Sequence, residues 1–322
     1  MSKQFYAERK FRLEARELIA TMNDIVEEYV GQGYRLTVRQ LYYQLVARGY
    51  IENTERSYQR ICSTVNDAKL AGLMDWDAIE DRTRAFIRRT RWENGSAIMS
   101  AAASGFHMDM WSNQAIRVFV IVEKEALAGV LEGVCNELDI LLLAARGYPS
   151  GTVLREFALS DLLPAIGYTR HGEPVKGFLP GRGGKAFRQT FCILHFGDHD
   201  PSGIDMSRDL GDRLALFCGF GDTKLGTTKL FKRVALNMDQ VEEQSPPENP
   251  AKVTDSLFAD YSRKYGDKSW ELDALKPDYL ASLVRTHATR LIDQEKWEQR
   301  QAEVEEVRGK IQDAAARFEE EA

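Results

Sequence analysis

Residues 191–206 read Phe-Cys-Ile-Leu-His-Phe-Gly-Asp-His-Asp-Pro-Ser-Gly-Ile-Asp-Met. The apolar run at its start is too short for a helix and is rich in strand-forming residues, which predicts a buried strand. Pro201 and Gly203 end that strand at the point where two carboxylates appear. Because ligands of open α/β sheets bind beyond the carboxyl ends of strands, this stretch predicts both a fold class and the position of a site.

Two aspartates follow the predicted strand and alternate with a histidine. In an extended chain Asp198 and Asp200 point the same way, with His199 between them. Their mutual repulsion is relieved by a hard divalent cation such as Mg²⁺, or by Mn²⁺. The alternative is a strand-to-helix turn in which an aspartate caps the helix. We leave His195 and His199 out of the expected site.

The second part of the chain alternates apolar runs with helical patterns. Helices are predicted over about 126–138 and 154–166, and from about residue 277 onward. The continuous apolar runs between and after them predict strands at 118–122, 140–144, 191–196 and 234–236. This pattern indicates an α/β domain over 113–322, with a mostly parallel, Rossmann-like sheet covered on both faces and a helical C-terminal extension.

A glutamate stands at the end of the first predicted strand. Glu123 directly follows Val122, just as Asp198 and Asp200 follow a later strand. Because parallel strands end at the same edge of a sheet, we expect these three carboxylates to share one Mg²⁺. The alternative is that Glu123 binds no metal and only interacts favourably with the positive N-terminal end of the next helix.

The N-terminal part, residues 1–112, has a helical pattern. Helices are predicted over 7–31 and 38–48, with a third that begins after Thr54 and a possible wing at 76–91; residues 94–112 resemble a linker. This predicts a winged helix-turn-helix that binds DNA. Residues 1–92 carry 16 Lys+Arg against 13 Asp+Glu in a chain of net charge −6. The candidate phosphate contacts are Arg82, Arg84, Arg88 and Arg89, unless they form only a solvated face.

One tyrosine of the helix over 38–48 lies off its apolar stripe. Tyr42 belongs to the stripe, whereas Tyr43 pairs with Arg39 one turn earlier. A guanidinium favours the phenolate and can hold a phosphate oxygen, so Tyr43 is a candidate nucleophile supported by Arg39. The alternative is an amphipathic tyrosine at a domain boundary.

The order Glu, then Asp-x-Asp, resembles the Toprim domain of primases, topoisomerases and small nucleases. With the Arg-x-x-Tyr-Tyr helix before it, the chain resembles the A subunit of topoisomerase VI, including short A-like proteins of phages and mobile elements. The resemblance implies Mg²⁺ at Glu123, Asp198 and Asp200. It also implies attack of Tyr43 on double-stranded DNA, which leaves a 5′-phosphotyrosyl link.

The resemblance further implies a homodimer that makes a double-strand break, with each tyrosine at the partner's metal site. A separate ATPase subunit is a possible partner, because the chain has no ATPase domain. The loop Gly181–Ala186 lacks the spacing of a P-loop. Gln40 stands where an acidic residue is common in the family.

Two alternatives to the transesterase stay open. The first is a Toprim nuclease that hydrolyses DNA with metal-activated water, in a mobile-element or plasmid-defence role. The second is a DNA-binding module with an idle metal site. Composition agrees with a globular protein, and four scattered cysteines predict reduced thiols and a cytoplasmic location. We expect no membrane span.

Overall fold

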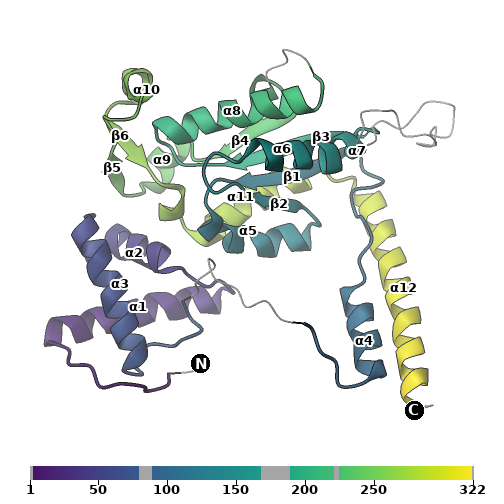
Figure 1. Cartoon of the computed structure of the whole chain (residues 1–322), viewed down its shortest axis with the longest axis horizontal. Coiled ribbons are helices and arrows are strands. Elements are labelled where there is room, and N and C mark those ends of the chain that lie inside the picture. The colour runs from purple at the N-terminus through teal and green to yellow at the C-terminus, as the bar shows by residue number, and fades with distance from the viewer. Residues whose placement is uncertain (1–2, 80–88, 168–188, 221–224, 321–322) are drawn as a thin grey trace.

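The computed structural model describes residues 3–79, 89–167, 189–220 and 225–320. Figure 1 shows three parts: an N-terminal helical unit, a sheet covered by helices, and a pair of helices that projects away from the sheet. The loop with Asp198 and Asp200 follows one strand of this sheet.

The N-terminal unit contains the three predicted helices, α1 (Leu13–Gly31), α2 (Val38–Ala47) and α3 (Glu55–Leu70). Helix α2 begins with a capping box, in which the Thr37 side chain accepts from the Gln40 amide and the Gln40 side chain accepts from the Thr37 amide. Most of the predicted wing, including Arg82, Arg84 and Arg88, lies outside the described residues. Arg89 is described and exposed.

A four-stranded parallel sheet forms the centre of the second part, as predicted. Its strands are β1 (Ile116–Val122), β2 (Leu141–Ala144), β3 (Thr190–Phe196) and β4 (Phe231–Ala235), in the order β2-β1-β3-β4. The mixture of helices and this parallel sheet confirms the α/β class.

The two central strands, β1 and β3, are buried on both faces along most of their length, which explains why they are largely apolar. Val118 and Val120 of β1 belong to a core with α5 (Glu125–Glu137) and α11 (Pro277–Thr289). Phe119 and Ile121 point to the other face and a core with α6 (Gly151–Phe157) and α8 (Pro201–Phe217). The remaining short elements of the domain are η1 (Ala158–Leu162), α7 (Leu163–Ala165), η2 (Leu225–Thr227), α9 (Met238–Gln244) and α10 (Phe258–Tyr265).

A small antiparallel hairpin, not expected from the sequence, lies beside the carboxyl edge of the sheet. It consists of β5 (Glu248–Pro250) and β6 (Lys268–Trp270), and the turn η3 (Leu272–Ala274) follows it. His199 and Trp270 exchange backbone hydrogen bonds of 2.9 and 3.0 Å. This bridge fixes the hairpin, and with it η3, next to the Asp198–Asp200 loop.

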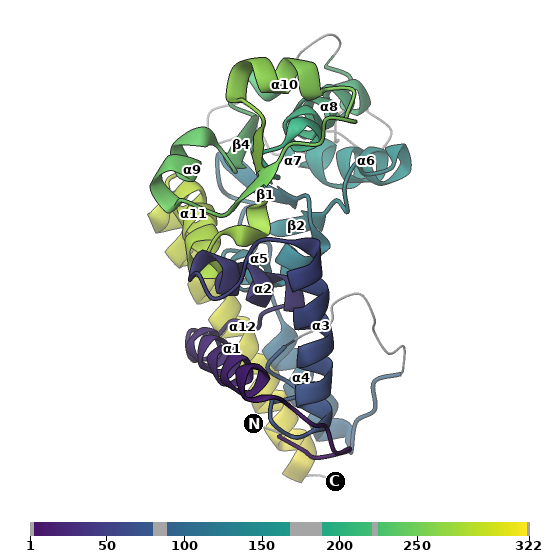
Figure 2. The ribbon, with the colours of Figure 1, turned by 90° about the vertical axis from the view of Figure 1, so that its left-hand side faces the viewer.

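The projecting pair consists of α4 (Gly95–Gly105) and α12 (Gln294–Glu320), which run side by side in Figures 1 and 2. The predicted linker over 94–112 is therefore wrong for residues 95–105. Asn94 caps α4. The many alanine, glycine and serine side chains of this helix allow it to pack closely on α12. No described helix has the length and apolar character needed to cross a membrane.

Candidate functional site

The site lies where the order of strands reverses. The chain passes from β1 to β2 on one side and from β3 to β4 on the other, so the carboxyl ends of β1 and β3 border a switch point. Val122 and Phe196 are paired at these ends, and the Glu123 amide donates to the Phe196 carbonyl at 2.8 Å. Glu123 and Asp198 are thereby brought together, as the sequence predicts, whereas Asp200 does not form a close trio of ligand atoms with them.

Glu123 and Asp198 are in direct contact. The Asp198 amide donates to Glu123 Oε2 at 2.9 Å, and both side chains are buried. Burial raises the pKa of Glu123, and it raises the pKa of Asp198 to about 7. Two buried carboxyl groups with raised pKa values at a switch point are typical of a functional site.

Asp200 has the role of helix cap that the alternative interpretation gave it. Its Oδ1 accepts from the Gly203 amide at 2.6 Å and from Ser202 Oγ at 3.0 Å. Both of these contacts use the same oxygen, so the capping role and a role in metal binding are compatible.

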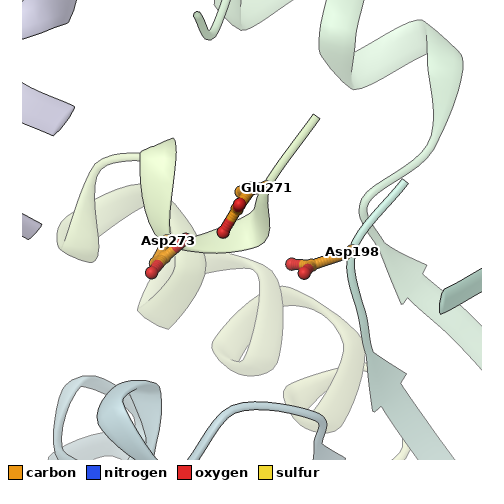
Figure 3. Close-up of side chains that lie close together, drawn as sticks. All are labelled: Asp198, Glu271 and Asp273. Carbon is orange, nitrogen blue, oxygen red and sulfur yellow. The ribbon is translucent and has the colours of Figure 1, made fainter. Parts of the chain in front are cut away.

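Two further carboxylates reach the edge from the hairpin side. Glu271 and Asp273 flank the start of η3, and the Leu272 amide between them donates to Asp198 Oδ1 at 2.8 Å. Figure 3 shows Asp198, Glu271 and Asp273 converging. Within the described residues, this is the one trio whose ligand atoms lie within 4.8 Å of one another. Neither Glu271 nor Asp273 follows a predicted strand, so no local pattern of the sequence points to them.

Lys124 lies at the centre of this trio. Its Nζ is 2.9 Å from Asp198 Oδ2 and 3.0 Å from Asp273 Oδ1, and it also contacts Glu271 Oε2. Burial alone would lower the pKa of Lys124, but the three carboxylates raise it well above its usual value. Burial likewise opposes ionisation of Glu271, yet Lys124 and Arg39 lower its pKa to about 2. Lys124 and Arg39 thus keep Glu271 ionised, and Lys124 contacts all three carboxylates.

Arg39 joins the N-terminal unit to the same carboxylates. Its Nη2 pairs with Glu271 Oε2 and its Nε lies 3.0 Å from Asp273 Oδ2, while the guanidinium lies 5.8 Å from the centre of the Tyr43 ring. The two candidate residues of α2 are therefore brought to the acidic edge within one chain.

Tyr43 is buried, with 4% of its surface exposed, because it packs with residues that include Ala274 of η3. Burial raises the pKa of its phenol, and Glu271 and Asp273 raise it further, whereas Arg39 acts in the opposite direction. Arg39 does favour the phenolate, as expected, but burial and the two carboxylates outweigh it, so the Tyr43 phenol is harder to ionise than an exposed tyrosine. A cavity of about 300 Å³ adjoins Tyr43, Arg39 and Glu271.

Arg233 of β4 stabilises the Asp198–Asp200 loop through hydrogen bonds to backbone carbonyls. Its guanidinium donates to the carbonyls of Gly197 and Gly203 at 2.9 Å each, and also to the Asp198 carbonyl. Burial lowers its pKa to about 10, against the opposing charges of the nearby carboxylates. His195 is fully buried and bonds Ser207 at 2.9 Å, in agreement with its place outside the expected site.

No protein-family model and no curated protein matches this sequence. A function is therefore inferred from the chemistry of the residues at the carboxyl edge of the sheet. This edge combines buried carboxylates, which suit Mg²⁺ or Mn²⁺, with a guanidinium that can hold a phosphate oxygen and with a nearby phenol.

The first prediction concerns Gly203, which lets the loop approach α8 closely. A Cβ at this position would lie 2.3 Å from the Asp198 carbonyl oxygen. We expect Gly203→Ala to lower the free energy of unfolding by about 2 kcal/mol or more, because the loop or the helix must shift. The control is Gly133→Ala in α5, where a Cβ meets no atom within 4 Å. Thermal unfolding that ranked the two variants equally would contradict the close approach.

The second prediction concerns the acid stability that Glu271 provides. Its pKa falls from 4.5 to about 2 on folding, so its stabilising effect is full above about pH 4.5 and disappears as the pH falls through about 2. Glu271→Gln should therefore cost up to about 3 kcal/mol near neutral pH, with a difference from wild type that shrinks below pH 4. Urea titrations at several pH values measure this. Glu248→Gln, which removes an exposed ion pair with Lys268, should cost under about 1 kcal/mol.

Proposed function

We propose that this chain cleaves double-stranded DNA in a divalent-metal-dependent reaction, as a topoisomerase VI A-like transesterase. In this proposal Glu123, Asp198 and Asp200 hold Mg²⁺ or Mn²⁺, Tyr43 is the nucleophile and Arg39 supports it. The observation that carries the proposal is the meeting of two elements at one edge. The acidic ends of β1 and β3 adjoin each other, and Arg39 of α2 pairs with carboxylates of the same edge.

The site residues fit the chemistry of phosphodiester transfer. A bound divalent ion would neutralise charge on the transferring phosphate and on the departing 3′ oxygen. The Tyr43 oxygen forms a bond to phosphorus as the bond between phosphorus and the 3′ oxygen breaks. The phenol loses its proton, and the departing 3′ oxygen takes up a proton to become a hydroxyl. Arg39 is placed to hold a phosphate oxygen next to the ring of Tyr43.

Tyr43 must become accessible for this reaction. Arg39 is engaged by Glu271 and Asp273, and Tyr43 is buried beside them. A DNA phosphate competes with these carboxylates for Arg39, so DNA binding itself favours release of α2 from η3. The winged helix-turn-helix and its arginines are the proposed DNA-binding surface. The proposed assembly is a homodimer in which the released α2 brings Tyr43 to the metal site of the partner, with a separate ATPase subunit as a further partner.

A second candidate is a nuclease that hydrolyses DNA with metal-activated water. The burial of Tyr43 favours it, because a buried phenol with a raised pKa is a poor nucleophile. The same carboxylates would hold the ion in both reactions. The two candidates differ only in which oxygen attacks phosphorus.

The test is an incubation of the full-length chain with supercoiled plasmid in Mg²⁺ or Mn²⁺, with EDTA as the control. Denaturation with detergent should leave linear DNA with protein attached at its 5′ ends, and protease should remove that protein. Linear DNA without attached protein would support hydrolysis. DNA binding without metal-dependent cleavage would contradict both reactions and leave a DNA-binding module.

A further inference from the structure

The acidic edge has a defined balance of charge. Its five carboxylates belong to Glu123, Asp198, Asp200, Glu271 and Asp273, and its three cations to Arg39, Lys124 and Arg233. When all are ionised the edge carries a net charge of −2. One divalent ion balances that charge, whereas two would leave an excess of positive charge in a partly buried place.

Lys124 is matched to the trio that would otherwise hold a metal ion. An ammonium group has three N–H donors, and Lys124 has three carboxylate neighbours, Asp198, Glu271 and Asp273. Its side chain is 21% exposed and reaches the trio directly from the end of β1. A divalent ion at this place needs oxygen ligands at about 2.0–2.1 Å from itself, so it cannot share the trio with the ammonium nitrogen.

We propose that Lys124 takes the place of a second metal ion. It is a cation attached to the chain between Asp198, Glu271 and Asp273, and it leaves room for a single divalent ion on the side of Glu123 and Asp200. This inference rests on the proposed function, because it assigns the number and position of the ions that the reaction uses. Asp198 contacts Lys124 through Oδ2 and accepts from the Leu272 amide through Oδ1, and its own amide donates to Glu123 on the other side.

The contacts of Glu123 and Asp200 agree with this division. Glu123 uses Oε2 for the Asp198 amide, and Asp200 uses Oδ1 for the start of α8. Neither residue forms an ion pair with Lys124 among those of the described residues. Within the described residues no hydrogen bond uses Glu123 Oε1 or Asp200 Oδ2, so these two oxygens remain for a divalent ion on this side.

The experiment counts Mn²⁺ ions bound to the full-length chain without DNA, by electron paramagnetic resonance and calorimetry. We expect one ion in the wild type, and one in Glu271→Gln with an affinity changed less than about threefold. Asp200→Asn retains a good helix cap and should weaken binding at least about tenfold, because it removes a ligand. Lys124→Met should bind two ions, and Lys124→Met with Glu271→Gln should return to one. Lys232→Met, which changes an exposed lysine of β4, is the matched control and should bind one.

The outcomes separate this inference from the function. Two ions in the wild type, or a loss of the single ion in Glu271→Gln, would overturn the role of Lys124 while the proposed cleavage stands. Absence of Mn²⁺ binding in the wild type would overturn the proposed function and this inference together. Lys124→Met leaves three carboxylates facing one another, so its melting temperature should fall and recover with Mn²⁺. If that variant does not fold, the wild type, Glu271→Gln and Asp200→Asn still decide.

Discussion

Asp198→Asn is expected to reduce Mg²⁺-dependent DNA cleavage by at least about a thousandfold, because Asp198 joins both halves of the site. Its amide contacts Glu123, its Oδ1 accepts from the Leu272 amide, and its Oδ2 pairs with Lys124. Asparagine keeps an oxygen for the Leu272 amide but removes the negative charge that a metal ion requires. The substitution therefore tests the charge with little change of shape.

Plasmid cleavage at saturating Mg²⁺ measures this effect, and circular dichroism verifies that the variant is folded. The matched control is Asp260→Asn, which changes an exposed aspartate paired with Arg263 on α10 and should cleave like the wild type. Retention of cleavage by a folded Asp198→Asn chain would place the reaction outside this edge of the sheet.

Tyr43→Phe is expected to eliminate the covalent protein–DNA adduct and to reduce cleavage by about 10⁴-fold or more, because it removes the attacking oxygen. Phenylalanine retains the ring that lies 5.8 Å from the Arg39 guanidinium, so the contact of α2 with the acidic edge is preserved. Labelled DNA that migrates with the protein after denaturation measures the adduct.

Tyr42→Phe is the control for this experiment. The Tyr42 hydroxyl donates to Asn53 Oδ1 at 2.8 Å, and its loss should cost about 1 kcal/mol of stability without loss of the adduct. Full cleavage by Tyr43→Phe, together with its loss in Asp198→Asn, would assign the attack to water. The adduct thus distinguishes the transesterase from the nuclease. The Asp198→Asn substitution tests the metal site that both reactions require.

Local sequence patterns predict only part of the candidate site. Glu123 and Asp198 were placed together correctly, because each directly follows an apolar run and parallel strands end at one edge. Asp200 was read both as a ligand and as a helix cap, and the cap is present. Glu271 and Asp273 are not predicted as site residues, because they follow no predicted strand and their position along the chain does not indicate where they lie.

The sequence by itself determined the α/β class, the positions of the main strands along the chain, the three N-terminal helices and the edge at which Glu123 and Asp198 meet. These follow from apolar periodicity and end signals within each segment. Only the tertiary structure brought Glu271 and Asp273 to Asp198, through the bridge of His199 with Trp270. It also placed Lys124 among them and buried Tyr43 under η3. Those contacts join residues far apart in the chain, so they depend on how the segments pack and not on any local pattern.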